Sequence, residues 1–237
     1  MISPEPAEQY VLHELLLSLE QANAAAERND MILAAARACV GMDIGFISEF
    51  SGDHRFFRHV DTCLEKSPIA VGDSLPLSEG YCQKIIEGDL PQLIPDTAAV
   101  QAAMALDITR SLPIGAHMSV PIGRHDGRVY GTFCCLSMKS DTSLTVRDLD
   151  IMRSFARFAA HELDRDLAHK GDLAESAARI DAVLETAAYS AVFQPIIRLA
   201  DGAVVGFEAL PRFSMEPVPA PDNWFAEAFQ TGLSVFL

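Results

Sequence analysis

The residues of this sequence that could carry thiol or metal chemistry are five cysteines and seven histidines. The cysteines are Cys39, Cys63, Cys82, Cys134 and Cys135. Their number is odd, and their spacing matches neither a Cys-x-x-Cys pair nor a zinc site. The histidines are scattered and form no metal-binding pattern. The sequence therefore predicts neither a disulfide framework nor a structural zinc site, and it favours a reducing, cytoplasmic compartment.

The charge of the chain limits its classes of partner. Lys and Arg total 18 against 33 Asp and Glu, so the formal net charge is −15. Generic binding to nucleic acid or to an anionic membrane needs clustered basic residues, so we expect neither partner. No segment approaches the ~20 apolar residues of a membrane span, and residues 1–6 do not resemble a signal peptide. A local basic pocket for a phosphate-bearing ligand is compatible with this charge.

The first half of the chain predicts helices followed by a hairpin. Residues 1–29 have the periodicity of an amphipathic helix, and Asn29 and Asp30 could cap a buried, Ala-rich helix at 31–39. The pattern then changes to that of two strands, at 44–50 and 56–63. Short helices are expected at 81–87 and 98–106, with a short strand at Leu93-Ile94 between them.

A second hairpin and a closing helix complete the predicted domain. Two apolar runs, 116–122 and 129–138, flank Asp126-Gly127, whose glycine tolerates the positive φ of a hairpin turn. A helix begins after Thr145 and places Leu149, Met152, Phe155, Phe158 and Ala159 on one side. Together the segments predict an α+β domain with a largely antiparallel sheet.

The remaining residues predict a helical connector and the start of another domain. Residues 162–184 are charged and helical with near-heptad apolar spacing, and Gly171-Asp172 could end one helix and cap the next. This segment fits equally a solvated connecting helix and a dimerising helix that transmits a signal. Two β segments then flank Asp201-Gly202, and the apolar end at 232–237 indicates a domain that is cut short.

The chain resembles a GAF domain over about residues 25–165. The resemblance is carried by Gly80-Tyr81-Cys82, Leu90-Pro91, Ile94-Pro95-Asp96-Thr97, Ser119-Val120-Pro121-Ile122, Asp126-Gly127 and Gly131-Thr132-Phe133. It implies a six-stranded antiparallel sheet with flanking helices, a sensory or regulatory role, and a homodimer formed through the terminal helices. We place an N-terminal helix at 1–29, the GAF domain at 30–169 and the helical connector at 170–190.

Residues 191–237 resemble the opening of an EAL domain, the catalytic module of cyclic di-GMP phosphodiesterases. The matching residues are Phe193-Gln194-Pro195-Ile196, Asp201-Gly202, Gly206-Phe207-Glu208-Ala209-Leu210 and Arg212, while Pro211 replaces an aliphatic residue of the family. The resemblance implies that Glu208 ligates Mg²⁺ or Mn²⁺ in the intact domain, and that Gln194, Leu210 and Arg212 contact cyclic di-GMP. Carboxylates suit hard metals and arginine suits phosphate.

An EAL domain resembles a TIM barrel, which needs at least ~200 residues, so only an incomplete barrel segment is expected here. The catalytic set is incomplete, and we expect no hydrolysis of cyclic di-GMP by this chain itself. The first interpretation is a GAF sensor that controls a C-terminal EAL phosphodiesterase. An alternative is a non-enzymatic dimerisation or partner-binding module with a degenerate EAL remnant.

The GAF resemblance also suggests residues for a pocket whose ligand the sequence does not identify. Those expected to line or rim it are Phe46, Cys82, Asp96, His117 and Ser119. Each has an ordinary structural interpretation as well; Asp96, for example, could cap the helix expected at Ala98.

Two special GAF chemistries fit the sequence less well. Bilin-binding relatives carry a Cys-His pair where this chain has Met104 and Ala105, so we expect no covalent bilin. The free methionine-R-sulfoxide reductases are a GAF-type enzyme family that uses cysteines. Cys82 lies near the position of one of these cysteines, but Leu106 stands near the position of the essential cysteine.

Overall fold

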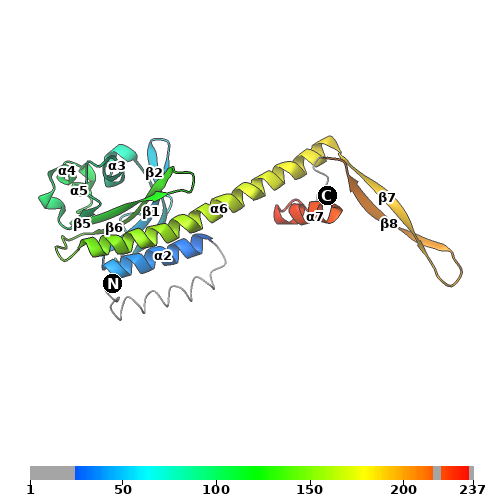
Figure 1. Cartoon of the computed structure of the whole chain (residues 1–237), viewed down its shortest axis with the longest axis horizontal. Helices are drawn as coiled ribbons and strands as arrows, with labels where there is room; N and C mark the ends of the chain where they lie inside the picture. The colour runs from blue at the N-terminus through cyan, green and yellow to red at the C-terminus, as the bar shows by residue number, and fades with distance from the viewer. Residues whose placement is uncertain (1–24, 216–219, 235–237) are drawn as a thin grey trace. The chain divides into compact units, whose positions relative to one another are not determined.

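The computed structural model describes residues 25–215 and 220–234, and the chain divides into two compact units at Asp166/Leu167 (Figure 1). The first unit contains a six-stranded, entirely antiparallel sheet with strand order β3-β2-β1-β6-β5-β4. Its elements are α2 (Ala25–Val40), β1 (Ile44–Ser51), β2 (His54–Thr62), β3 (Ser74–Pro76), η1 (Leu77–Glu79), α3 (Tyr81–Glu87), β4 (Leu93–Ile94), η2 (Thr97–Ala99), α4 (Gln101–Met104), α5 (Asp107–Ser111), β5 (Ala116–Gly123), β6 (Val129–Ser137) and the beginning of α6 (Val146–Thr186).

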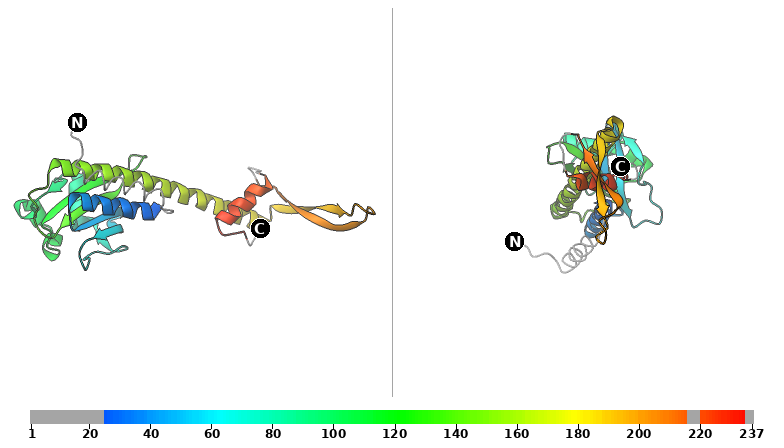
Figure 2. Two further views of the ribbon diagram at one scale, coloured as in Figure 1. Left: turned by 90° about the horizontal axis from the view of Figure 1, so that it is seen from below. Right: turned by 90° about the vertical axis from the view of Figure 1, so that its right-hand side faces the viewer.

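The two faces of the sheet bury different cores. Helices α2 and α6 lie side by side over one face, as Figures 1 and 2 show. There Leu33 of α2 and Met152 of α6 pack with Phe133 and Cys135 of β6. The opposite face packs against α3 and the segments after it, and Cys134 belongs to this second core. Because successive strand residues point to opposite faces, the adjacent thiols of Cys134 and Cys135 lie in separate cores.

Two positions in the β5–β6 hairpin require glycine. Gly127 adopts φ +80° in the turn between β5 and β6, which confirms the hairpin expected from Asp126-Gly127. At Gly131, a β-carbon would lie 1.8 Å from the Ser48 carbonyl oxygen of β1, so the close approach of the two strands excludes any side chain there.

Several local expectations need correction. The N-terminal helix expected at 1–29 falls almost wholly outside the described residues. The cap expected at Asn29 and Asp30 is wrong, because α2 begins at Ala25 and Asp30 instead accepts a hydrogen bond from His59 Nδ1, at 2.7 Å. Strand β3 was not expected at all.

The helix expected at 98–106 is wrong as a single element, because η2 and α4 occupy that stretch and α5 follows it. Asp96 accepts a hydrogen bond from the Ala98 N–H at 3.1 Å and so caps η2. The helix break expected at Gly171-Asp172 is also wrong, since α6 has no interruption there. Phe158 was expected on the core-facing side of α6, but it is 54% exposed.

The second unit contains the C-terminal part of α6, a two-stranded ribbon of β7 (Tyr189–Ile197) and β8 (Val204–Phe213), and α7 (Pro221–Gln230). A small core forms where Ile180 and Val183 of α6 meet Phe213, Trp224 and Ala228. The Phe213 and Trp224 rings stack with centroids 5.2 Å apart. The ribbon itself is exposed along nearly its whole length, including its large apolar side chains.

The prolines of the ribbon occupy positions that cost it no internal hydrogen bonds. The Ser214 N–H donates to the Ala188 carbonyl at 2.9 Å, which fixes the alternation of hydrogen-bonded pairs along the ladder. Pro195 and Pro211 fall in the intervening pairs, whose N–H positions point away from the partner strand. Pro211 is therefore compatible with an undistorted ribbon.

Candidate ligand-binding site

A positive charge is buried on the face of the sheet opposite α2 and α6. Arg55 of β2 is 4% exposed, and its Nη1 donates to the Cys82 Sγ at 3.0 Å. Its guanidinium carbon lies 5.2 Å from the centre of the Phe57 ring. Among the described residues, Arg55 Nε has no hydrogen-bond partner, and no carboxylate forms an ion pair with the guanidinium.

Gly80, just before α3, makes room for this guanidinium. A β-carbon at Gly80 would lie 2.7 Å from Arg55 Cζ. The φ of Gly80 is −120°, which any residue can adopt. The glycine is therefore explained by the nearby guanidinium and not by backbone strain.

An imidazole and a phenol stack beside the arginine. The rings of His117 and Tyr81 lie 4.3 Å apart and are tilted by 20°, and both residues are buried. The Tyr81 hydroxyl hydrogen-bonds with Thr109 Oγ1 at 2.7 Å, whereas His117 Nδ1 has no partner in the described part of the chain. Burial, reinforced by the charge of Arg55, lowers the pKa of His117 to about 3. The imidazole is therefore neutral near pH 7.

Two thiols and two hydroxyls adjoin the arginine. The sulfur atoms of Cys82 and Cys134 are 3.8 Å apart, and Cys134 Sγ lies 3.0 Å from Ser119 Oγ and 3.2 Å from Thr132 Oγ1. A hydrogen bond from the Cys134 thiol, together with the charge of Arg55, lowers the pKa of Cys82 to about 5, although burial opposes the shift. Burial and the neighbouring Cys82 raise the pKa of Cys134 well above its usual value. Of the two thiols, Cys82 is therefore the one whose ionised form is favoured.

The inner of two adjoining cavities reaches this cluster. The inner one, about 20 Å³, is lined by Arg55, Tyr81 and His117 together with apolar side chains. The outer one is about 360 Å³ and is bordered by Asp73 and Ser111. The two share the apolar lining residues Phe57, Ile69, Leu75, Ile108 and Leu112. The inner cavity has room for about one water molecule.

A separate groove of about 460 Å³ lies between β5 and α6, along Pro121, Arg153 and Arg157. It shares no lining residue with the other two cavities, and the buried polar cluster does not reach it.

The five residues suggested by the sequence lie in three different settings. Phe46 and His117 line the inner cavity. Cys82 and Ser119 are buried in the thiol–hydroxyl cluster next to it. Asp96 caps η2 and is absent from the cavity linings described above.

Sequence reasoning missed Arg55 and the role of Tyr81. The signal for Arg55 was present, because it shares its strand parity with Phe57, an inward-facing aromatic residue. A charged residue at an inward position of a strand is unusual enough to indicate a site. Tyr81 belonged to a recognised motif, but only the tertiary structure places its ring on His117.

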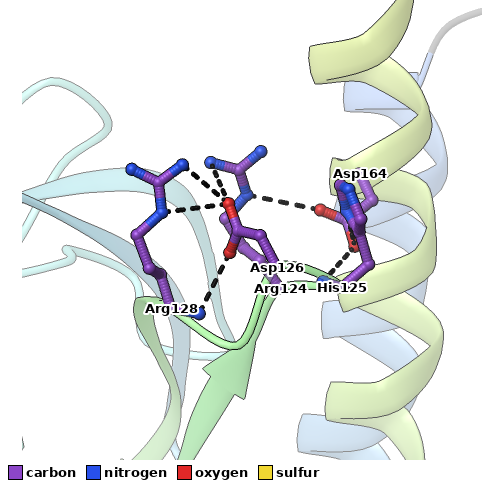
Figure 3. Close-up of polar contacts among 5 residues, drawn as sticks. All are labelled: Arg124, His125, Asp126, Arg128 and Asp164. Carbon is purple, nitrogen blue, oxygen red and sulfur yellow. Dashed lines mark hydrogen bonds and ion pairs between the residues drawn. The ribbon is translucent and has the colours of Figure 1, made fainter.

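The polar turn between β5 and β6 is tied to α6 (Figure 3). Asp164 of α6 accepts hydrogen bonds from the His125 N–H at 3.1 Å and from Arg124 Nε at 3.4 Å. Within the turn, hydrogen bonds from Arg128 lower the pKa of Asp126 to about 2, so this carboxylate stays ionised. These contacts join the hairpin that carries His117 and Cys134 to the long helix.

The four residues implied by the EAL resemblance share one face of the ribbon. Gln194 pairs directly with Glu208, and Leu210 and Arg212 follow Glu208 at alternate positions of β8. Glu208 is exposed. No group of three or more His, Cys, Asp or Glu within residues 25–215 and 220–234 is arranged to hold a metal ion. A single carboxylate does not make an Mg²⁺ or Mn²⁺ site, so the described residues do not fit the metal by themselves.

None of the helices in the described ranges is both long enough and apolar enough to cross a membrane.

Solved structures share the fold of the first unit. The chromophore-binding domain of an unusual bacteriophytochrome from R. palustris matches at 13% identity and TM-score 0.57, covering 71% of this chain and 64% of that one. The phycocyanobilin-bound GAF domain of a cyanobacterial phytochrome matches at 14% identity and TM-score 0.57, covering 71% and 98%. A GAF domain from an Acinetobacter phosphoenolpyruvate-protein phosphotransferase matches at 11% identity and TM-score 0.56, covering 71% and 99%.

These likenesses establish the fold alone, since the identities are low. The chain spans 64% of the first bacteriophytochrome structure and 43% of a longer structure of the R. palustris bacteriophytochrome RpBphP3. A search of the curated proteins gives no match. The family described as GAF domain matches residues 25–164, more than half of the sequence. Together with the six-stranded sheet, this match shows that the chain belongs to the GAF domain family and carries a sensory GAF domain.

Proposed function

We propose that this GAF domain is a small-molecule sensor that controls a C-terminal EAL phosphodiesterase acting on cyclic di-GMP. The observation that carries the sensing role is the buried cluster of Arg55, His117 and Cys82 beside a small cavity that shares five apolar lining residues with a larger one. Buried polar atoms without partners are costly unless a ligand or water satisfies them. Arg55 Nε and His117 Nδ1 are two such atoms.

The ribbon supports the proposed output module. Gln194, Glu208, Leu210 and Arg212 lie on one face, as residues that contact one substrate and its metal would. Large apolar side chains on the ribbon, including Phe193 at 63% exposure and Phe207 at 64%, are typical of strands that pack within a larger barrel. Further residues of that barrel would have to supply the other ligands of Mg²⁺ or Mn²⁺ and the remaining catalytic groups.

The signal would pass along α6. This helix begins against the GAF sheet and ends at Thr186, shortly before β7. The contacts of Asp164 connect it to the β5–β6 hairpin, whose strands carry His117 and Cys134. We propose a cytoplasmic homodimer in which ligand binding shifts the arrangement of the paired α6 helices.

The output role is tested on the protein encoded by the whole coding sequence, with cyclic di-GMP hydrolysis as the readout. We expect hydrolysis that depends on Mg²⁺ or Mn²⁺, and its loss in Glu208→Gln. The matched control is Glu175→Gln, an exposed carboxylate of α6, which should retain activity. If the whole protein shows no hydrolysis, the output proposal fails, and the non-enzymatic partner-binding module becomes the better interpretation.

The sensing role is tested separately by native mass spectrometry of this chain. We expect a bound small molecule of defined mass, or a mass shift on addition of a metabolite fraction. A chain that binds nothing under either condition would contradict the sensor. A thiol-dependent turnover of free methionine sulfoxide would instead support the reductase alternative.

A further inference from the structure

The buried guanidinium of Arg55 lacks a carboxylate counter-ion. Burying a positive charge without an anion is strongly unfavourable. In the described part of the chain, the group that can serve as its counter-ion is the Cys82 thiolate. The Cys82 Sγ accepts a hydrogen bond from Arg55 Nη1 at 3.0 Å. That contact leaves Nε unpartnered. The arginine therefore has a free donor in a position closed to bulk water.

A second unpartnered group lines the same inner cavity. His117 Nδ1 is buried and makes no hydrogen bond within the described residues. The neutral imidazole can present an N–H there, so the cavity offers one charged donor and one neutral donor. This pair suits the two oxygens of a carboxylate. A phosphate dianion would need more positive charge than one guanidinium supplies.

The junction of the two cavities favours an apolar ligand body. The side chains shared by the inner and outer cavities are all apolar. Asp73 borders the outer cavity, and its carboxylate would repel an anion placed there. The anionic end of a ligand therefore belongs beside Arg55, and its apolar part belongs in the outer cavity.

We propose that this site binds a small organic monocarboxylate, with its carboxylate held by Arg55 and His117 and its apolar body in the outer cavity. This proposal rests on the sensing role proposed above and names its ligand class. The carboxylate replaces the Cys82 thiolate as the counter-ion of Arg55, so Cys82 takes up a proton when the ligand binds. Because the inner cavity is small, binding also displaces lining side chains such as Ile108 of α5 and Leu112, which follows α5.

The test measures binding of benzoate and hexanoate to the chain by isothermal titration calorimetry, beside the neutral amides benzamide and hexanamide and inorganic phosphate. We expect the carboxylates to bind and the amides and phosphate to bind at least about tenfold more weakly, since a charge-assisted hydrogen bond is lost or mismatched. The thiolate absorbance near 240 nm should fall as the carboxylate binds.

Three variants locate the site. Arg55→Met should weaken carboxylate binding at least about tenfold. Gly80→Ala keeps every charge but introduces a β-carbon 2.7 Å from Arg55 Cζ, so it should also weaken binding by displacing the guanidinium. If Arg55→Met fails to fold, Gly80→Ala still tests whether the position of the guanidinium decides carboxylate binding. Arg58→Met, an exposed arginine on the same strand, is the matched control and should bind like the wild type.

The outcomes separate this inference from the sensor itself. Carboxylates that bind no better than their amides, or no better than phosphate, overturn the carboxylate site, as does unchanged binding in folded Arg55→Met or Gly80→Ala. If native mass spectrometry then finds a neutral bound molecule, the sensor stands without this ligand class. If neither probes nor co-purified molecules bind, both proposals fail.

Discussion

Position 82 holds a thiol between two groups that favour its ionised form. The Cys134 thiol and the guanidinium of Arg55 both contact its sulfur. Buried thiols without such contacts behave differently: burial raises the pKa of Cys135, in the other core, to about 12. The contrast between two cysteines of similar burial shows that the immediate partners, and not burial alone, decide which thiol ionises.

We predict that Cys82 titrates with a midpoint near pH 5 in the ligand-free chain. Loss of the Cys134 hydrogen bond, the largest cause of the lowered pKa, should raise this midpoint in Cys134→Ala. The measurement is the thiolate absorbance near 240 nm as a function of pH. Cys82→Ser should abolish the transition, while Cys63→Ser, at an exposed thiol, should leave it unchanged. A transition that survives in Cys82→Ser would assign the thiolate to another cysteine.

His117 should make the GAF unit less stable in acid. Its pKa of about 3 in the folded chain lies below the ordinary histidine pKa of 6.5, so the unfolded chain binds the extra proton first. The contribution of His117 to the free energy of unfolding is fully present above pH 6.5 and is lost as the pH falls toward 3. Between pH 7 and 4.5 the loss is about 2 to 3 kcal/mol. The groups that face the imidazole are Arg55 and Tyr81.

The measurement is urea unfolding followed by circular dichroism at pH 7 and pH 4.5, in wild type and in His117→Gln. We expect a smaller difference between the two pH values in the variant, because glutamine does not titrate. The control is His125→Gln, an exposed histidine of the β5–β6 turn. An equal pH dependence in wild type and His117→Gln would refute a buried neutral imidazole.

The sequence indicates the site only in outline. Phe46 and His117 could be named because the family pattern places them near the pocket, and both line the cavity. Arg55 could have been found by strand parity, but its contact with Cys82 depends on α3 lying across the sheet. Pairings between residues distant in sequence, such as Tyr81 with His117, depend on tertiary packing that periodicity does not encode.

At the scale of elements, α7 depends on a small core. Trp224 is the single tryptophan of the sequence and is fully buried against Phe213. Arg179 of α6 donates to Glu227 of α7 at 2.7 Å, at the edge of the same core. Tryptophan fluorescence therefore reports on this unit without a contribution from the GAF unit.

We predict that Ile180→Ala lowers the stability of the second unit by about 2 to 5 kcal/mol, because it leaves a cavity beside the tryptophan core. The measurement is urea unfolding followed by Trp224 fluorescence. Leu199→Ala is the control, since Leu199 is fully exposed in the ribbon turn and its truncation should leave the midpoint unchanged. Equal midpoints for Ile180→Ala and wild type would mean that Trp224 does not rely on this contact.

Elements with strong patterns were predicted well, and weakly patterned ones were not. The two hairpins follow from alternating apolar residues and glycine turns. In contrast, the Ala-rich segment 98–106 predicts one helix, but the structure has η2, which Asp96 caps, and a separate short α4 there. Gly171 does not end α6, because the cost of a glycine inside a helix, about 1 kcal/mol, is small beside that of ending the helix there.

At the scale of the molecule, exposed residues of α6 bear on assembly. Phe158 is 54% exposed and Val146 is 64% exposed, whereas Leu149, Met152, Phe155 and Ala159 of the same part of α6 are buried against the GAF sheet. The charge of −15 opposes association unless an apolar surface compensates for it. Phe158, the exposed aromatic residue of this part of α6, is therefore the contact that we propose for the homodimer.

We predict that Phe158→Glu weakens self-association at least about tenfold, because it places a charge in an apolar helix contact. The measurement is sedimentation equilibrium over a range of concentrations. The matched control is Phe229→Glu on α7, a phenylalanine that is 78% exposed. If Phe158→Glu remains as dimeric as the control, the contact lies elsewhere or the chain is a monomer.

The alternation of hydrogen-bonded and non-hydrogen-bonded pairs along β7 and β8 affects how the ribbon can pair with strands of other chains. Because Pro195 and Pro211 sit where the backbone points outward, each outer edge of the ribbon lacks one hydrogen-bond donor. A strand from another chain that paired with either outer edge of the ribbon would lack one backbone hydrogen bond. The prolines thus disfavour edge-to-edge β-aggregation, and they leave the hydrogen bonds between β7 and β8 intact.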